Sequence, residues 1–352
     1  MTKITSGNFF EDFAVGQEIV HATPRTVTEG DVAMYQALYG GRFAVHSSTP
    51  FAQACGFVAA PLDPMLVFHL VFGKTVPDVS LNAIANLGYA QGRFGVPVYP
   101  GDTLATISRV IGVKANRDGQ TGVVYVHSTG RNQRGEMVLD YVRWVMVRKR
   151  TVESPAPDAV VPALADSVAP QTMVIPVAVP AGQFSTALSG SPHYWEDYAV
   201  GERIDHVDAM TIEESEHMSA ARLFQNTARV HFNQHVEREG RFGRRIVYGG
   251  HIISMARALS FNGLANTLGM VAIHGGRHTN PSFAGDTIYA WSEILAADAL
   301  ENRDDVGVLR VRTVALKDQN ASTFPLKQAD GSYLSSVVLD LDYSVLLPRR
   351  RP

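Results

Sequence analysis

Two stretches of the chain are mainly apolar, and each precedes several runs rich in β-branched residues. The apolar stretches are MLVFHLVFG at 65–73 and HIISMARALSFNGL at 251–264, and each predicts a central helix. The β-branched runs lie at 96–113, 121–130 and 137–147 after the first stretch, and at 285–295, 307–316 and 335–347 after the second. Such runs are typical of strands. Hairpin-rich strands after one helix predict an antiparallel sheet packed on that helix, which is an α+β arrangement.

An internal repeat explains why this pattern occurs twice. Residues 9–17 read FFEDFAVGQ and residues 194–202 read YWEDYAVGE, an offset of 185 positions. Further matches at this offset, or at 184, are Thr26 with Thr211, His46 with His231, and the Gly-Asp-Thr triplet at 101–103 with that at 285–287. An ordered series of matches indicates two copies of one module. We therefore expect an N-terminal module at 1–150 and a C-terminal module at 193–352.

Residues 151–192 join the two copies and contain seven prolines. Each proline fixes φ and removes a backbone donor, so no regular helix or central strand is expected here. The segment is rich in Pro, Ala and Val, and it is too apolar for a free solvated tether. We expect a linker that lies extended over the protein surface.

Both copies carry signals for local structure at equivalent places. The segments 26–40 and 211–226 are predicted amphipathic helices. Their starts fit the capping-box pattern through Thr26 with Glu29 and through Thr211 with Glu214. The two Gly-Asp-Thr triplets are predicted to be turns that begin strands.

Composition narrows the class of protein. With 45% hydrophobic and 18% charged residues the chain reads as soluble and globular, and its formal net charge of −3 argues against a nucleic-acid partner. Cys55 is the single cysteine, so neither an internal disulfide nor a cysteine-based metal site is expected. The sequence shows no signal-peptide pattern and no apolar run long enough for a membrane span. We expect a cytoplasmic protein without a membrane partner.

Three motifs point to a known family. PVYPGDT at 97–103 and PSFAGDT at 281–287 match a Pro-x-x-x-Gly-Asp-Thr strand start, and IVYGGH at 246–251 places Gly249 eighteen residues after His231. On these motifs the chain resembles the MaoC-like hydratases and dehydratases. The resemblance implies a double hot-dog fold, in which two tandem modules, each a curved antiparallel sheet wrapped around a central helix, pack as a pseudo-dimer.

The resemblance also implies an activity. These enzymes are hydro-lyases that reversibly add water to the double bond of an enoyl-CoA. EDFAVGQ, LYGGRFAVHSS and NTARVHFN are most similar to the branch that hydrates the branched dicarboxylic ester mesaconyl-C1-CoA to β-methylmalyl-CoA in carbon assimilation. The acyl-CoA thioester would be the substrate, and no cofactor is expected.

The family's site carries over unequally to the two copies. The matches for its catalytic His, oxyanion-binding Gly and catalytic Asp are His231, Gly249 and Asn226 in copy two, and His46, Pro64 and Gly41 in copy one. Proline has no N–H to stabilise a thioester oxygen, so copy two retains more of the site. An amide cannot accept a proton at neutral pH. His231 would therefore be the sole base, with Asn226 positioning water and Gly249 donating to the oxyanion, or a carboxylate from elsewhere, Asp63 or Glu214, would assist.

Other side chains are candidates for holding the substrate. A free acyl carboxylate calls for a guanidinium, and Arg229 and Arg42 lie close in sequence to the two histidines. Tyr248 and His251 flank the glycine motif and could border the acyl group, and the binding set also includes His46 and Asp63. The arginines at 238, 241, 244 and 245 are candidates for the CoA phosphates.

Three other functions stay open on the sequence. One is a (3R)-specific 2-enoyl-CoA hydratase acting on fatty enoyl-CoA, and another is a hot-dog acyl-CoA thioesterase. The third is a non-catalytic acyl-CoA binding module, because both copies lack the Asp. The spacing of His231 and His235 resembles a zinc pair, but no Glu stands between them, so no metal is expected. A homodimer or higher homo-oligomer is expected from base rates for soluble enzymes.

Overall fold

The computed structural model, which describes residues 3–350, is built on ten strands and two central helices. The N-terminal strands are β1 (Glu18–Thr26), β2 (Ala83–Phe94), β3 (Thr103–Ala115), β4 (Thr121–Arg131) and β5 (Met137–Arg148). The C-terminal strands are β6 (Arg203–Thr211), β7 (Gly269–His278), β8 (Thr287–Ala299), β9 (Val306–Lys317) and β10 (Val337–Pro348). The central helices are α4 (Pro64–Thr75) and α9 (Gly249–Leu259), where the apolar stretches predicted them.

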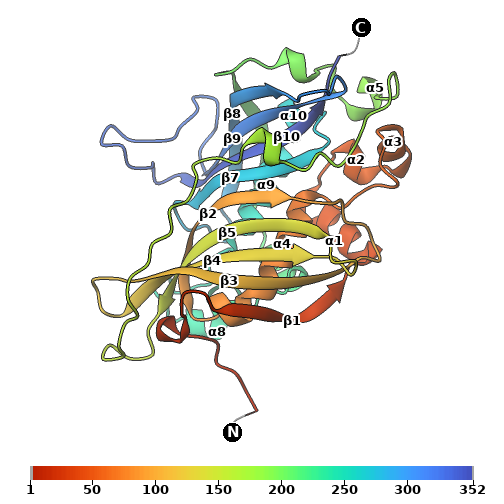
Figure 1. Cartoon of the computed structure of the whole chain (residues 1–352). Coiled ribbons are helices and arrows are strands. Elements are labelled where there is room, and N and C mark those ends of the chain that lie inside the picture. Colours follow the sequence, from red (N-terminus) through yellow and green to blue (C-terminus); the bar gives the residue numbers. More distant parts are fainter. Residues whose placement is uncertain (1–2, 351–352) are drawn as a thin grey trace.

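All ten strands form one antiparallel sheet in the order β1-β3-β4-β5-β2-β7-β10-β9-β8-β6. The two modules join where β2 pairs with β7, with Tyr89 opposite Gly276 and Arg93 opposite Ala272. Figure 1 shows the sheet curving in front of α4 and α9. The main hydrophobic core is continuous across both modules and includes Phe68 of α4 and Ile252 of α9. The predicted α+β double hot-dog fold is confirmed.

Shorter helices lie around the two central ones. In the N-terminal half these are α1 (Glu29–Tyr39), α2 (Ala44–Ser47) and α3 (Thr49–Ala54). In the rest of the chain they are α5 (Thr186–Ser189), α6 (Glu214–Leu223), α7 (Arg229–Phe232), α8 (Gln234–Glu237) and α10 (Phe261–Leu264). Single turns occur at Phe10–Asp12, Val76–Ser80, Pro170–Thr172 and Trp195–Asp197. Within residues 3–350, every helix is too short or too polar to cross a lipid bilayer.

The capping boxes lie elsewhere than the sequence pattern predicted. Helix α1 begins after Thr28, whose side chain accepts from the N–H of Asp31, while Thr26 is the last residue of β1. The hydroxyl of Thr26 instead hydrogen-bonds that of Thr103 across the sheet at 2.8 Å. In copy two the N-cap of α6 is Glu213, without a side-chain cap bond. The prediction was wrong because both Thr26 and Thr28 fit the pattern, and strand pairing occupies Thr26.

The repeated Glu-Asp pair ties the last strand of each module to its start. In copy two Glu196 accepts the backbone N–H of Arg350 at 3.0 Å, and Asp197 pairs with the Arg350 guanidinium at 2.7 Å. The same contacts are made in copy one by Glu11, Asp12 and Arg150. These contacts supply a structural reason for the strongest match between the copies.

The Gly-Asp-Thr triplets form turns, as predicted. Gly101 and Gly285 have φ of 97° and 95°, in the left-handed region that favours glycine. Strands β3 and β8 begin at the threonines that follow. The aspartates accept backbone N–H groups three residues earlier, which closes each turn.

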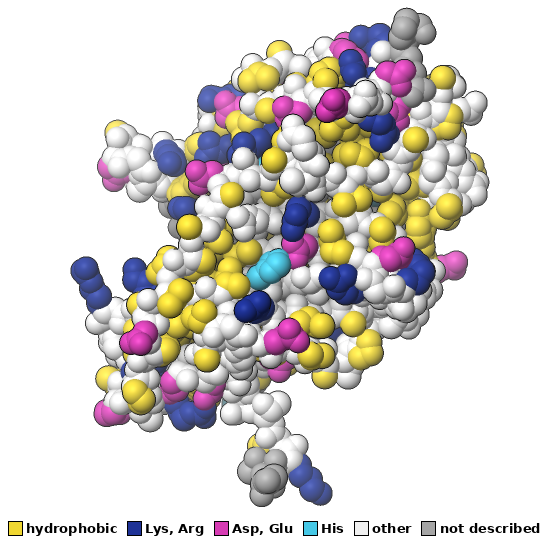
Figure 2. Space-filling model, viewed as in Figure 1, with side chains coloured by type: hydrophobic (Ala, Val, Ile, Leu, Met, Phe, Trp, Pro, Cys, Tyr) yellow, Lys and Arg dark blue, Asp and Glu magenta, His cyan; other side chains and the backbone are white. Residues whose placement is uncertain are grey.

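The connecting segment 151–192 runs over the outside of the sheet (Figure 1). Its regular structure is limited to one-turn helices and a single bridge between Val160 and Val113. Val168 and Val179 donate backbone hydrogen bonds to His274 and Asp305 at 2.9 and 2.8 Å. The segment is thus anchored to the N-terminal module at Val160 and to the C-terminal module at Val168 and Val179. Basic and acidic side chains are interspersed over the face seen in Figure 2, without a field of one sign.

Candidate active site

A cavity of about 690 Å³ lies between the two modules. Strands β2 and β5 line it from the N-terminal module, and α7, α8, the start of α9 and the end of β7 line it from the C-terminal module. The cavity brings together His231, Asn226, Gly249, Arg229 and Tyr248. Five of the residues singled out in the sequence therefore share one space.

His231 stands on the short helix α7 with a defined tautomer. Its Nδ1 lies 3.0 Å from the carbonyl oxygen of Ile246. A carbonyl can only accept, so Nδ1 carries the hydrogen and Nε2 of the neutral ring is left as an acceptor. Desolvation lowers the pKa of His231 to about 4, so the imidazole is uncharged at neutral pH. Its ring centroid lies 5.7 Å from that of Tyr248.

Gly249 is the first residue of α9, and its N–H has no acceptor inside the helix. The helix dipole adds positive potential at this end. A Cβ on Gly249 would lie 2.5 Å from the imidazole of His278, so only glycine lets the strand end approach the helix start. The position combines a free donor with close packing against an imidazole.

His278 is a member of the site that sequence reasoning missed. It ends β7, lines the cavity, and its Nε2 lies 3.1 Å from the hydroxyl of Tyr89 on β2. Desolvation and the neighbouring His231 lower the pKa of His278 to about 4. A signal was present in the repeat, because the offset of 184 places Phe94 of copy one opposite His278. Phe94 shows that an apolar side chain can fill this position. The imidazole of His278 therefore indicates a role other than packing.

Asn226 and Tyr248 are buried in the cavity wall. The Asn226 Oδ1 accepts the N–H of Ala228 at 3.3 Å, which leaves its NH₂ group available. The Tyr248 hydroxyl lies 3.4 Å from Nδ1 of His69 on α4. Each side chain thus makes one hydrogen bond within the protein while it borders the cavity.

Arginines lie at the mouth of the cavity. Arg229 is largely exposed, and its Nη1 donates to Oδ1 of Asn82 at 2.8 Å. Arg148 and Arg241 also line the cavity and are exposed. Of the other arginines in the predicted phosphate cluster, Arg245 is bound to Glu214.

The remaining candidates lie apart from the large cavity. His251 is buried with its Nδ1 2.8 Å from the hydroxyl of Tyr39. Asp63 caps α4 by accepting the N–H of Met65 at 2.8 Å. Arg42 is exposed and lies over the ring of Phe261, 4.5 Å from its centroid.

Glu214 and the His231–His235 pair also have defined positions in the structure. Glu214 is exposed and bound by Arg245 and His217, and it does not line the cavity. His231 and His235 stand on separate short helices, α7 and α8, so they do not share a helix face.

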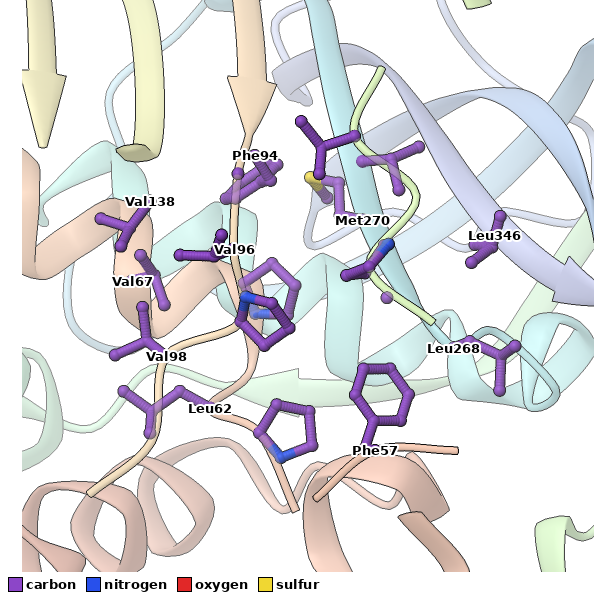
Figure 3. Close-up of a pocket in the computed structure, with 18 of the residues that line it drawn as sticks. Phe57, Leu62, Val67, Phe94, Val96, Val98, Val138, Leu268, Met270 and Leu346 are labelled. Carbon is purple, nitrogen blue, oxygen red and sulfur yellow. The ribbon is translucent and has the colours of Figure 1, made fainter. Parts of the chain in front are cut away.

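The equivalent space in copy one is a small apolar cavity of about 50 Å³ (Figure 3). There His46 repeats the geometry of His231, with Nδ1 3.1 Å from the carbonyl of Pro61. Pro64 stands in place of Gly249 and Phe94 in place of His278, and the connecting segment contributes Val174 and Pro176. Copy one has therefore kept the backbone hydrogen bond of its histidine. Apolar side chains fill most of the space around that histidine.

Known proteins resemble this chain over its full length. The family model described as mesaconyl-CoA hydratase matches residues 2–328. The β-methylmalyl-CoA dehydratase of Chloroflexus aurantiacus is 68% identical over 348 residues, covering 99% of both chains. The mesaconyl-CoA hydratase of Cereibacter sphaeroides is 57% identical, covering 99% of this chain and 100% of that protein.

Solved structures agree with the fold. The crystal structure of a MaoC domain protein dehydratase from Chloroflexus aurantiacus superposes with a TM-score of 0.98 at 67% identity, covering 100% of both chains. A Mycobacterium tuberculosis protein with a double hotdog fold gives a TM-score of 0.76 at 27% identity, covering 97% of this chain and 99% of that one. The chain therefore belongs to the mesaconyl-CoA hydratase family of MaoC-like double hot-dog proteins.

Proposed function

We propose that this protein reversibly hydrates mesaconyl-C1-CoA to β-methylmalyl-CoA. The observation that carries the proposal is the meeting of His231, Asn226 and Gly249 on one cavity of about 690 Å³. Relatives named for this chemistry are 68% and 57% identical across nearly their whole length, which favours it over thioester hydrolysis or acyl-CoA binding alone. The CoA thioester is the substrate, and water is the second reactant.

His231 serves as the base in this reaction. Its Nε2 accepts a proton from water, because Nδ1–H is held by the carbonyl of Ile246. The water oxygen bonds to the alkene carbon β to the thioester, and the π electrons move onto the thioester oxygen. The N–H of Gly249, at the positive end of α9, stabilises that oxygen. Asn226 orients the water through its amide.

A proton must then reach the α-carbon. His278 borders the same cavity with Nε2 hydrogen-bonded to Tyr89, and it is the second imidazole able to exchange a proton there. The imidazolium that His231 forms on taking the water proton returns that proton to the α-carbon, so one OH and one H are added and His231 ends neutral. His278, itself neutral at ordinary pH because desolvation lowers its pKa to about 4, relays this proton and is not its source. The exposed Arg148, Arg229 and Arg241 at the mouth suit the phosphates of CoA.

The test is a spectrophotometric assay of the conjugated enoyl thioester with mesaconyl-C1-CoA. We expect His231→Gln to lower kcat by at least about 10²-fold, the lower bound for loss of a positioned base. The matched change in copy one is His46→Gln. If only copy two has a working site, the His46→Gln protein should keep its activity within about threefold of wild type. An H231Q protein that stays within a few-fold of wild type would overturn the assignment.

Two further readouts separate the alternatives. Release of free thiol without loss of enoyl absorbance would indicate a thioesterase. Crotonyl-CoA turned over far better than mesaconyl-C1-CoA would indicate a hydratase for fatty enoyl-CoA.

A further inference from the structure

Arg143 is a fully buried arginine among the residues that line the large cavity. It lies on β5 in the N-terminal module, and it lines the same cavity as His231 and His278 of the C-terminal module. Its Nη2 donates to the hydroxyl of Thr75 at 2.7 Å and to that of Ser80 at 3.3 Å. Its Nε and Nη1 are buried and have no hydrogen-bond partner. Three of the five N–H donors of this guanidinium are therefore unused.

The charge of Arg143 is also without a counter-ion. Within residues 3–350, no carboxylate forms an ion pair with its guanidinium. Its surroundings are aromatic, with the Phe72 ring centroid 4.3 Å from the guanidinium carbon and Tyr89 and Tyr248 close by. A guanidinium does not lose its proton in proteins, and an unpaired buried charge is costly. A site that keeps such a charge beside an open cavity is suited to an anionic ligand.

The fold itself does not require an arginine here. An offset of 200 positions relates β5 to β10, and it places Tyr343 of copy two opposite Arg143. The Tyr343 hydroxyl is satisfied by Thr313 at 2.9 Å within the core. The same strand position in copy two is therefore filled by a neutral, bonded side chain. Arg143 lines the same large cavity as His231 and His278 of copy two.

A single tyrosine side chain separates Arg143 from each of the two histidines of the proposed mechanism. Tyr89 is the cross-strand partner of Arg143 and is hydrogen-bonded to His278. Tyr248 packs against Phe72, the ring under the Arg143 guanidinium, and its own ring centroid lies 5.7 Å from that of His231. In mesaconyl-C1-CoA the free carboxylate is attached to the carbon that receives the water oxygen. A receptor for that carboxylate must therefore lie close to the base, deep in the cavity, and not among the exposed arginines of the mouth.

We propose that Arg143 binds the free carboxylate of the acyl group and selects dicarboxylic enoyl-CoA esters over monocarboxylic ones. This inference rests on the proposed hydratase function. The N–H groups of Nε and Nη1 donate to the carboxylate oxygens, while Thr75 and Ser80 hold Nη2 in place. Arg229, which sequence position favoured for this role, is exposed and engaged with Asn82.

The experiment compares two substrates that differ only in this group. Mesaconyl-C1-CoA carries the carboxylate, and 2-methylcrotonyl-CoA carries a methyl group in its place. We expect the wild-type kcat/KM to favour mesaconyl-C1-CoA by at least about 10³-fold, and Arg143→Met to lower it by at least about 10²-fold for mesaconyl-C1-CoA alone. An Arg143→Met protein that loses activity on both substrates equally, or a wild type that does not discriminate, would overturn the proposal.

Arg257 provides a matched control. It is also a buried arginine over an aromatic ring, 3.8 Å from the centroid of Phe43, but Ser260 and Thr267 hold its guanidinium and it does not line the cavity. Arg257→Met should leave the ratio of the two kcat/KM values unchanged, even if stability falls. Should Arg143→Met fail to fold, Arg143→Lys retains the charge without the guanidinium and should reduce the ratio in part.

Binding measurements separate this inference from the proposed function. If the wild type hydrates neither ester, the hydratase function fails, and calorimetric titration with each ester then decides the role of Arg143. The inference holds if the wild type binds mesaconyl-C1-CoA at least about tenfold more tightly than 2-methylcrotonyl-CoA and the Arg143→Met protein does not. Equal affinities in the wild type would reject it.

Discussion

The hydroxyl of Tyr89 and Nε2 of His278 lie 3.1 Å apart, across the seam where the two modules join. Tyr89 belongs to β2 and His278 ends β7, so neither module contains this pair alone. His278 in turn packs against Gly249 at the start of α9. The candidate site is consequently a product of module pairing, although its recognisable motif lies entirely in copy two.

Removal of the Tyr89 hydroxyl tests whether this contact sets the orientation of His278. A neutral hydrogen bond is worth about 1 kcal/mol net, so Tyr89→Phe should lower kcat about fivefold and change KM little. The matched control is Tyr343→Phe, which removes a buried hydroxyl bonded to Thr313 outside the cavity. Steady-state kinetics of both variants with mesaconyl-C1-CoA would decide. Equal losses in the two proteins would argue against a role for the Tyr89–His278 bond.

A methyl group at Gly249 should disrupt the site by a steric clash with His278. The added Cβ would lie 2.5 Å from the His278 imidazole, so the ring or the helix start must move. Because displacement of reacting groups by about 1 Å can cost about 10²-fold in rate, Gly249→Ala should lower kcat by roughly that factor. Gly30→Ala is the control, since its Cβ would meet only Thr28 at 3.5 Å within α1. Activity of G249A near that of G30A would show that the close approach is not needed.

The repeat, the fold class and the residues of one wall of the cavity could be predicted from the sequence. His231, Asn226 and Gly249 could be found because they lie within a short motif whose spacing is fixed by α7 and α9. His278 and Arg143 could not, because each reaches the cavity from a strand whose neighbours are set by long-range pairing. The signals that remained were differences between the copies, Phe94 for His278 and Tyr343 for Arg143. Such differences become informative only when the equivalent strands are aligned.

The pH dependence of catalysis should follow the lowered pKa of His231. The base must be neutral, and desolvation holds its pKa at about 4, so the acid limb lies well below the usual value of about 6.5. We expect kcat/KM to stay nearly constant from about pH 8 to about pH 5 and to fall only at lower pH. Initial rates in constant-ionic-strength buffers, with circular dichroism to confirm folding, provide the measurement. A half-maximal rate near pH 6.5 would contradict the assignment of His231, with its lowered pKa, as the base.

The stability of the fold should also depend on pH through buried histidines such as His206. This side chain is fully buried, with its ring nitrogens 2.7 Å from the carbonyl of Asn262 and 2.7 Å from the hydroxyl of Ser292, and desolvation lowers its pKa to about 4. The unfolded chain takes up a proton below about pH 6.5 while the folded chain does not until about pH 4. The free energy of unfolding is therefore highest above pH 6.5 and falls between these values, by about 1–2 kcal/mol at pH 5 for this residue. Urea unfolding at pH 7 and pH 5 should show a smaller difference for His206→Gln than for wild type, and an unchanged difference for His193→Gln, because His193 is exposed. The same loss between pH 7 and pH 5 in all three proteins would assign the effect to other groups.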